Sequence, residues 1–422
     1  MPAALDFDPA LPALPAAVRP AEAAALLAAR GHEVGELRRQ DVKYLPLTRC
    51  VTSWAVTLGE AGGRAERTVA AVVVTPEGAS LRFPDEDEGL PGLAEALDAR
   101  RMLARLAERV LAPGGQVLEP GGQVLAPGER VLGCAATPVR YKFGTRCTIR
   151  YDLRTHAGVR TLYGKLVAGG WGARPGILAA LRRAASADPA MPEILPVVAH
   201  WPDLRLLVQP AAEQATELNQ RAFDPAVPAA ARDGWLAAAG CHLAALHACR
   251  LPGVALPAAG ADLDELRACA APMAQAAPEL ARRYESVIGL LDRRAGAEPP
   301  EPAVTSHGAF RTDQLLIAGQ RQVMIDLDTA CRSEPARDLG NLLAYLDWKA
   351  IRRPALLPLA ERAGRVLLHA YADARPAPAE SRLALQRATS LAKIAGRRYR
   401  SLTVEEWPLV PRLLDAATAL AS

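Results

Sequence analysis

The sequence lacks the segments that would carry a chain through a membrane or hold it together with disulfides. Its first 20 residues have no basic stretch before an apolar one and are interrupted by prolines, unlike a secretory signal. Its longest β-type apolar run, residues 69–74, is far shorter than the roughly 18 apolar residues of a membrane helix. The seven cysteines include no Cys-x-x-Cys pair, so no disulfide framework is expected. We therefore expect a cytoplasmic protein that does not bind a membrane.

A large excess of one charge is also missing. The formal net charge is +4 over 422 residues, which is too small to indicate a nucleic-acid-binding protein. The charge is uneven, because residues 345–422 contain 13 Lys and Arg against 7 Asp and Glu. This basic end favours an anionic or neutral small molecule, or an acidic peptide, over a polycationic substrate.

The N-terminal part of the chain is expected to be an appended module of helices and strands, residues 1–112. Residues 20–30 are rich in Ala, as in a helix, and residues 93–111 have helical periodicity. Residues 51–58 and 67–76 alternate and are rich in Val and Thr, as in two strands of a hairpin. A seven-residue repeat beginning Pro-Gly-Gly-Gln-Val-Leu then predicts a linker over residues 113–130. The module could bind a protein partner.

The rest of the chain is expected to form a small β-rich lobe, residues 131–210, and a mostly helical lobe, residues 211–422. Strands are predicted at 137–143, 146–153 and 159–167, followed by a helix at 175–185 and strands at 194–198 and 204–208. Helices are predicted at 228–248, 262–271 and 278–295. Cys241, His242, His247 and Cys249 fall in this region. His242 and His247 are five residues apart, on different faces of a helix, which favours structural roles over a metal site.

Three motifs follow one another in the second half of the chain. Residues 306–317 read Ser-His-Gly-Ala-Phe-Arg-Thr-Asp-Gln-Leu-Leu-Ile, residues 323–328 read Val-Met-Ile-Asp-Leu-Asp, and residues 337–340 read Arg-Asp-Leu-Gly. Together they resemble the core of the aminoglycoside phosphotransferase/choline kinase family, whose pattern is His-Gly-Asp-x-x-x-x-Asn, then Ile-Asp, then Asp-Leu. The resemblance implies an α+β, bilobal protein-kinase-like fold, with an antiparallel-sheet small lobe, a helical large lobe and, here, an appended N-terminal α/β segment.

The resemblance also implies roles for individual residues, with ATP or GTP and Mg²⁺ as cofactors. Lys165 would contact the nucleotide phosphates, and Gln209 and Ala211 would belong to the hinge beside the base. Asp326 and Gln314 would bind the metal, and Asp328 is an alternative ligand on the same predicted strand face.

Two further residues would support the loop that contains the first motif. His307 would brace the loop through the backbone near Asp326. Asp338 would cap a helix and tie it to the loop.

Two positions depart from the family pattern. Ala309 occupies the place of the catalytic aspartate, and Asp313 is a possible substitute. The helix at 175–185 has no acidic residue to pair with Lys165, which leaves Asp188 or Glu193 as candidates. Two functions remain open: an ATP-dependent phosphotransferase acting on a small-molecule hydroxyl, or a pseudokinase that binds a nucleotide, partner or peptide without phosphoryl transfer.

The basic C-terminal region allows two interpretations. Lys393, Arg397, Arg398 and Arg400 would form either a solvated helix face or an anion site. Tyr345 and Trp348, three residues apart, would belong either to the core or to a surface that stacks on a sugar.

Overall fold

The computed structural model describes residues 8–59, 66–108, 124–125, 129–252, 255–258 and 262–422, which fold into two compact units. The first unit contains the chain up to residue 175, residues 196–211 and residues 400–402; the second contains the remainder. Antiparallel sheets and many helices confirm the predicted α+β class. Most of the predicted linker, 113–130, lies outside the described residues, and the division into four domains stays a prediction.

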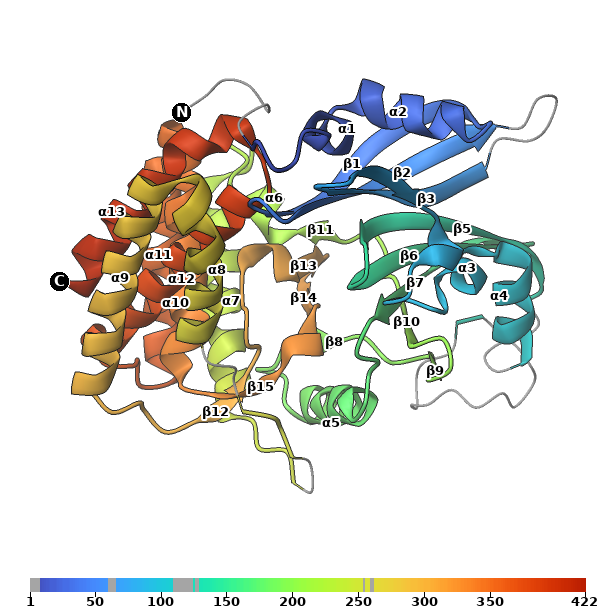
Figure 1. Ribbon diagram of the computed structural model, residues 1–422. Coiled ribbons are helices and arrows are strands. Elements are labelled where there is room, and N and C mark those ends of the chain that lie inside the picture. Colours follow the sequence, from blue (N-terminus) through green and yellow to red (C-terminus); the bar gives the residue numbers. More distant parts are fainter. Residues whose placement is uncertain (1–7, 60–65, 109–123, 126–128, 253–254, 259–261) are drawn as a thin grey trace. The chain divides into compact units, whose positions relative to one another are not determined.

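The first unit begins with a four-stranded antiparallel sheet whose strands follow one another in sequence order. Helices α1 and α2 pack against this sheet, and α2 has Pro20 at its first turn, where the missing N–H costs nothing (Figure 1). The elements are α1 (Leu14–Val18), α2 (Pro20–Ala29), β1 (Glu33–Leu45), β2 (Arg49–Gly59), β3 (Glu66–Thr75) and β4 (Gly78–Arg82).

The second sheet of this unit has the order β5-β6-β7-β10-β9. Strands β5, β6 and β7 are antiparallel neighbours, as predicted, and Gly144 and Gly158 adopt positive φ in the turns between them. The strands are β5 (Val131–Lys142), β6 (Arg146–Thr155), β7 (Gly158–Val167), β9 (Ala199–Trp201) and β10 (Leu206–Pro210).

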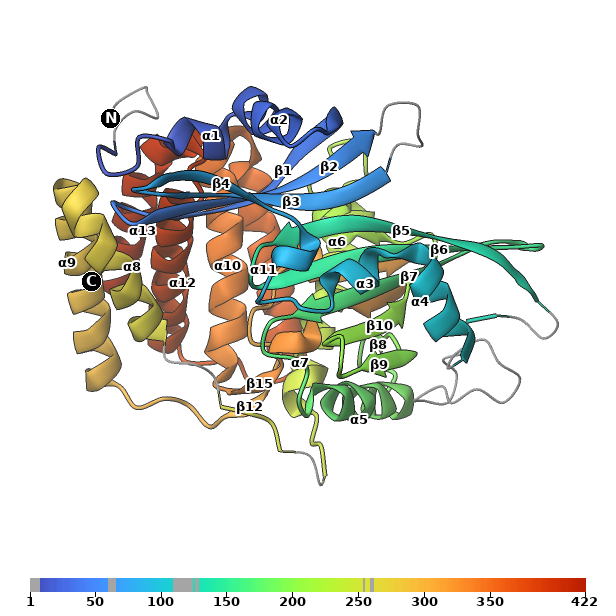
Figure 2. The same ribbon diagram turned by 45° about the vertical axis from the view of Figure 1, so that its right-hand side comes forward.

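The helical periodicity predicted over 93–111 is confirmed for its described part, which forms two helices, α3 (Leu93–Leu97) and α4 (Ala99–Leu106) (Figure 2). The Asp98 carboxylate between them accepts hydrogen bonds from the backbone N–H groups of Arg100 and Arg101 and starts the second helix.

The two sheets of the first unit share one hydrophobic core. Val69 and Val73 from β3 belong to the same buried cluster as Tyr151 from β6 and Leu166 from β7. A polar tie joins the same regions, because the buried Asp87 accepts hydrogen bonds from the Tyr141 hydroxyl, at 2.8 Å, and from the backbone of the β5–β6 turn. The described residues before β5 are thus packed into the unit that contains β5 to β7.

The second unit combines helices with two small sheets, of order β11-β13-β14-β8 and β12-β15. The predicted helices at 228–248, 262–271 and 278–295 are confirmed, as α7, α8 and α9. The helices are α5 (Arg174–Ala187), α6 (Leu218–Ala222), α7 (Ala229–Ala248), α8 (Asp262–Ala276), α9 (Pro278–Ala297), α10 (Pro335–Arg352), α11 (Leu357–Ala374), α12 (Glu380–Arg400) and α13 (Val410–Ala421). The strands are β8 (Glu193–Ile194), β11 (Thr216–Glu217), β12 (Val304–Ser306), β13 (Leu315–Ala318), β14 (Arg321–Met324) and β15 (Cys331–Ser333).

The strand predicted over 194–198 is wrong. Only Glu193 and Ile194 form a strand, which pairs in parallel with β14 in the second unit. Pro196 follows closely and has no N–H to continue a ladder. Among the described helices, none is long and apolar enough to span a bilayer.

Candidate functional site

The loop of the first motif, residues 307–310, is held in place by the carboxylate of Asp338. One oxygen accepts hydrogen bonds from the backbone N–H of His307, at 2.7 Å. The other accepts from the N–H groups of Gly308 and Phe310, at 2.9 and 3.4 Å. Asp338 is fully buried in the first turn of α10, so the predicted tie between helix and loop is confirmed. It is not the cap of the helix, because Glu334 occupies that position.

A buried side chain from α7 supports this carboxylate from behind. His247 Nε2 lies 3.2 Å from Asp338, and His247 Nδ1 lies 2.8 Å from the Tyr371 hydroxyl. Burial alone would raise the pKa of Asp338, but hydrogen bonds and charges from His247 and His307 outweigh it and hold that pKa below its usual range. His247 therefore has a structural role, as the helical spacing predicted.

The loop is also tied to the segment around Asp326. His307 Nε2 donates to the carbonyl oxygen of Ile325 at 2.9 Å, which confirms the predicted bracing contact. The Thr329 hydroxyl donates to the carbonyl oxygen of His307. Gly308 has φ of 88°, and a Cβ there would lie 2.4 Å from the carbonyl oxygen of Thr329. Only glycine fits this approach.

Gln314 and Asp326 flank the open end of the hairpin formed by β13 and β14. The N–H of Ile325 donates to the carbonyl oxygen of Gln314 at 2.9 Å, which extends the ladder by one pair. Asp326 comes next and adopts φ of 64°, a left-handed conformation that Asp tolerates better than most residues. The predicted strand face for Asp328 is wrong, because the chain turns here into a short 3₁₀ helix, Leu327–Thr329.

The donor set at this hairpin end suits a hard divalent cation. The Gln314 side chain is 4 % exposed, and among the described residues its Oε1 atom has no hydrogen-bond partner. A buried amide oxygen of this kind, with a carboxylate nearby in the chain, is the oxygen ligation that Mg²⁺ prefers. The residues present therefore fit a magnesium ion held by Asp326 and Gln314.

A small cavity of about 40 Å³ opens beside Ala309. Four cationic side chains line it, together with a single carboxylate, that of Asp262. The lining residues are Asp262, Gly308, Ala309, Arg311, Arg337, Asn341, Tyr345, Ser390, Lys393 and Arg397. We call this the Ala309 cavity. Asp313, the possible substitute for the missing base, is not among its lining residues; its carboxylate accepts a hydrogen bond from Arg311 Nε at 3.0 Å.

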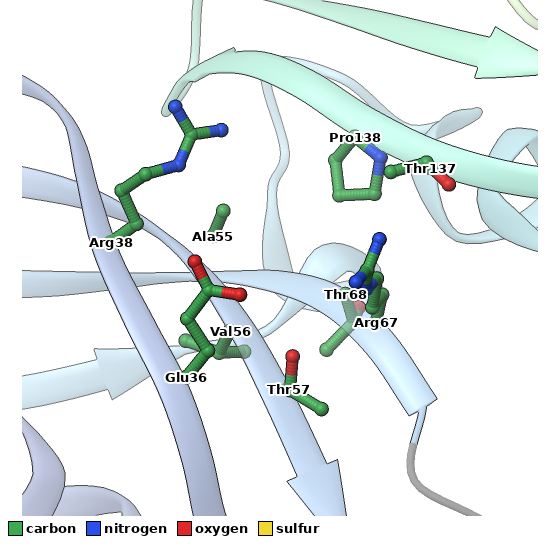
Figure 3. Close-up of a pocket in the computed structure, with 9 residues that line it drawn as sticks. All are labelled: Glu36, Arg38, Ala55, Val56, Thr57, Arg67, Thr68, Thr137 and Pro138. Carbon is green, nitrogen blue, oxygen red and sulfur yellow. The ribbon is translucent and has the colours of Figure 1, made fainter.

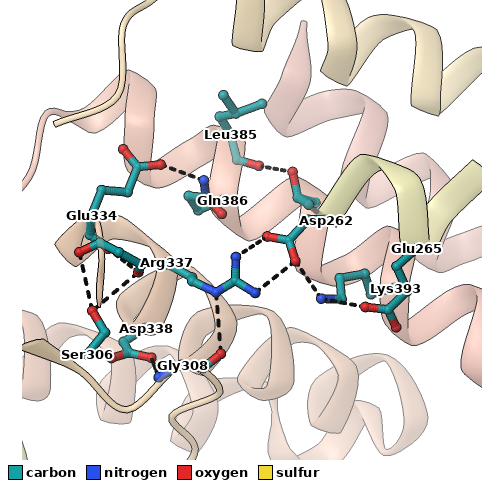
Figure 4. A network of polar contacts seen from close by, with 12 residues as sticks. Asp262, Glu265, Ser306, Gly308, Glu334, Arg337, Asp338, Leu385, Gln386 and Lys393 are labelled. Carbon is teal, nitrogen blue, oxygen red and sulfur yellow. Dashed lines mark hydrogen bonds and ion pairs between the residues drawn. The ribbon is translucent and has the colours of Figure 1, made fainter. Parts of the chain in front are cut away.

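Ion pairs order the cations of the Ala309 cavity (Figure 4). Arg337 makes a two-pronged contact to Asp262, at 2.6 and 2.9 Å, and its Nε donates to the carbonyl oxygen of Gly308. Lys393 lies 2.7 Å from the same carboxylate and 2.8 Å from Glu265. Arg397 also pairs with Glu265, at 3.1 Å. The residues that line the cavity thus include more cations than carboxylates, at the position where the family pattern has an acid.

Tyr345 contacts two of these cations. The Arg311 guanidinium carbon lies 4.8 Å from the centre of the Tyr345 ring, and Arg397 Nη1 lies 3.5 Å from its hydroxyl oxygen. Burial alone would raise the pKa of Tyr345, but the two arginines outweigh it and hold that pKa below its usual range. The phenol therefore senses the positive potential of the cavity.

The basic residues of α12 lie in different surroundings, and so do the two aromatic residues Tyr345 and Trp348. Lys393 and Arg397 line the cavity, whereas Arg398 pairs with Glu406 and lies over the Trp348 ring at 5.8 Å. Trp348 is 8 % exposed and belongs to the core, while Tyr345 lines the cavity. The core position of Trp348 is thus confirmed, whereas the anion site and the sugar-stacking surface stay predictions.

The nucleotide candidates Lys165, Gln209 and Ala211 lie in the first unit. Leu207 pairs with Lys165 and Gln209 with Tyr163, so Lys165 and Gln209 lie on the same face of the sheet. The buried Leu162 and Leu166 of β7 point to the opposite face. The N–H of Ala211 donates to the carbonyl oxygen of Thr161 at 2.9 Å, and the hinge role of Ala211 stays a prediction.

The two acids considered as partners of Lys165 have contacts in the second unit. Glu193 Oε2 lies 2.5 Å from Arg321 on the neighbouring strand β14. Asp188 Oδ1 accepts a hydrogen bond from the N–H of Ala190 at the end of α5. Neither of these two contacts is made to Lys165.

A second cavity lies in the first unit, with a volume of about 230 Å³. The strands β1, β2, β3 and β5 line it, and Figure 3 shows Glu36, Arg38 and Arg67 at its border. Its lining has both signs of charge and includes none of the predicted site residues.

Sequence reasoning missed most of the lining of the Ala309 cavity. Arg311 and Arg337 stand inside quoted motifs, and their charge next to a missing acid was a usable signal. Asp262 and Asn341 come from other elements and carry no such signal, since only the packing of α8 and α10 brings them to the loop.

Comparison with known protein families identifies the class of this protein. The profile of the phosphotransferase enzyme family matches residues 172–382, half of the chain. The chain belongs to this family. A search among curated protein sequences found no match.

Several solved structures are similar to this chain at low sequence identity. A choline/ethanolamine kinase family protein from Mesorhizobium loti is 17 % identical, over 68 % of this chain and 87 % of that one, with a TM-score of 0.43. A glucosamine kinase in complex with glucosamine, ADP and inorganic phosphate is 17 % identical, over 91 % and 93 %, with a TM-score of 0.43. An aminoglycoside-3'-phosphotransferase of type VIII is 21 % identical, over 60 % and 92 %, with a TM-score of 0.41.

Proposed function

We propose that the protein binds a nucleoside triphosphate with Mg²⁺ and transfers the terminal phosphoryl group to a small molecule in the cytoplasm. The observation that carries the proposal is the unpartnered, buried side-chain oxygen of Gln314 beside the hairpin end that holds Asp326. Family membership supports the same reaction class. Bound magnesium would neutralise phosphate charge as the phosphoryl group transfers.

The residues divide the work between binding and positioning. Lys165 would contact the phosphates, with Gln209 and Ala211 beside the base, and Asp326 and Gln314 would hold the metal. Asp338 and His307 hold the loop of residues 307–310 in place through hydrogen bonds. The loop therefore would not have to reorganise at the moment of reaction. Ala309 cannot accept a proton, so a hydroxyl acceptor would need another base.

A second candidate function is a pseudokinase that binds nucleotide without transfer. The observation that favours it is Ala309, because loss of a positioned base costs about 10²–10⁴-fold in rate without affecting nucleotide binding. Scaffolding of a peptide or a partner protein, including through residues 1–112, would then be the function.

Thermal-shift titration of the full chain with Mg-ATP and Mg-GTP tests the proposal. We expect ATP or GTP to raise the melting temperature only when Mg²⁺ is present, and Asp326→Asn to weaken this effect at least tenfold in nucleotide concentration. Asp373→Asn, an exposed residue on α11, is the matched control. An equal shift for the wild type and Asp326→Asn would refute the metal assignment, and binding without ADP formation for any acceptor would favour the pseudokinase.

A further inference from the structure

Two features at residue 309 point in the same direction. The loop has lost the acid that would take a proton from a neutral hydroxyl, and the cavity beside it is lined by four cations and one carboxylate. A neutral acceptor gains nothing from such a lining. An acceptor that is already an anion needs no base, and it is attracted by the charge.

We infer that the acceptor atom is an anionic oxygen, of a carboxylate or a phosphate monoester, held in the Ala309 cavity by Arg311, Lys393 and Arg397. The inference rests on the proposed phosphoryl transfer and names its substrate class. In the step, the anionic oxygen forms a bond to the terminal phosphorus of the nucleoside triphosphate. The bond from that phosphorus to the bridging oxygen breaks, and the nucleoside diphosphate leaves with the electron pair. No proton has to be removed from the acceptor.

The chemistry of the cavity suits a single anionic group, because four cationic side chains converge on it. Arginine provides paired N–H donors for such groups, and an ammonium adds a compact charge. The side chains of Lys393 and Arg311 are 15 % and 24 % exposed, so these two cations are partly screened from water, whereas Arg397 is 42 % exposed.

The same electrostatics explain why residue 309 is not an aspartate. A carboxylate at residue 309 would lie in the lining with Asp262 and would compete with an anionic acceptor for the same cations. Like charges at close range disfavour each other, by several kcal/mol in a site of low dielectric. With alanine at residue 309, Asp262 is the one carboxylate in the lining, and Asp313 and Glu265 pair with Arg311, Lys393 and Arg397 from outside it.

Anion binding without nucleotide tests the cavity directly. Isothermal titration of the full chain with inorganic phosphate and with acetate should give saturable binding. Arg397→Gln should weaken it roughly 10- to 100-fold, since a charge-assisted hydrogen bond is lost. Arg387→Gln is the matched control, because Arg387 is also on α12 and also pairs with one carboxylate, Asp347, but lies outside the cavity lining.

A second variant distinguishes the loss of anion binding from a loss of folding. Ala309→Asp, at a half-buried position, should keep the melting temperature of the wild type within a few degrees and still weaken phosphate binding at least tenfold. Phosphate or acetate binding that is the same in the wild type, Arg397→Gln and Ala309→Asp would overturn the inference.

Turnover with matched acceptors separates the acceptor classes. ADP release is measured with glucose, glucuronate and glucose 6-phosphate, and hydroxylamine is added to trap any acyl phosphate as a hydroxamate. We expect one anionic compound to be used at least tenfold better than glucose, and hydroxamate identifies a carboxylate acceptor. Faster phosphorylation of glucose would overturn the inference. No turnover with any compound, together with Arg397-dependent anion binding, would refute the proposed phosphoryl transfer and leave the anion site standing.

Discussion

The carboxylate of Asp338 provides the sharpest test of how the loop is held. In Asp338→Asn the side chain keeps its shape, but one of its two acceptor oxygens becomes an NH₂ donor that faces backbone N–H groups and His247. Breaking a buried, charge-assisted network by removing one partner costs about 3–5 kcal/mol. We expect a loss of that size in the free energy of unfolding.

Urea unfolding measures the loss, and Asp347→Asn is the control. Asp347 lies on the same helix, α10, and pairs with Arg387 at a partly exposed site, where an ion pair contributes about 0–1 kcal/mol. Hydrogen exchange of a peptide covering residues 304–312 should be faster in Asp338→Asn alone, because one or two of its amides lose their acceptor. A loss for Asp338→Asn no greater than that for Asp347→Asn would refute the account of the loop.

The same residue predicts a pH dependence. Its pKa in the folded protein lies below its usual range, so the ionised carboxylate stabilises the fold at pH values above its unfolded pKa of about 3.9. That contribution is lost as the pH falls through the folded pKa. The difference in stability between the wild type and Asp338→Asn should therefore narrow below about pH 4, and a difference that widens there would contradict the assigned charge.

Three further predictions concern close approaches and the cavity. Gly308→Ala should lower the free energy of unfolding by about 2–4 kcal/mol in a urea titration, since it combines positive φ with a contact to Thr329. Gly240→Ala places a Cβ 2.3 Å from the carbonyl oxygen of Leu367, so overpacking of about 1–3 kcal/mol should exceed the roughly 1 kcal/mol gained in helix propensity, and higher stability would refute the contact. Arg397→Gln should raise the pKa of Tyr345, seen as a shift of one tyrosinate absorbance step to higher pH; an unmoved step would contradict their contact.

The sequence predicted those parts of the fold whose signals are local. The strands β5, β6 and β7 alternate between buried and exposed residues and are joined by glycine turns, so they were visible in the pattern. β1 was missed because its segment, Glu-Val-Gly-Glu-Leu-Arg-Arg-Gln-Asp-Val-Lys-Tyr-Leu, is polar and has a single buried residue, Tyr44. β8 was misplaced because a two-residue parallel pairing depends on β14, which lies far along the chain.

The candidate site was predictable where a motif fixes both partners. His307 and Asp338 both belong to quoted motifs, and their contacts to the loop are confirmed. The Ala309 cavity was not predictable, because its cations come from the loop, α10 and α12, and only tertiary packing brings them together. The missing acid and the arginines inside the motifs are visible in the sequence, whereas their meeting with Lys393 and Arg397 is not.

The shared core of the first unit has a practical consequence for anyone shortening this protein. A chain beginning at residue 131 would keep β5, β6 and β7 but lose Val69 and Asp87, which would expose apolar side chains of these strands and leave the Tyr141 hydroxyl without the carboxylate of Asp87. Surfaces of that kind drive proteins into inclusion bodies. Recombinant work on the catalytic motifs should therefore retain the N-terminal hundred residues, however dispensable they look beside the phosphotransferase sequence pattern.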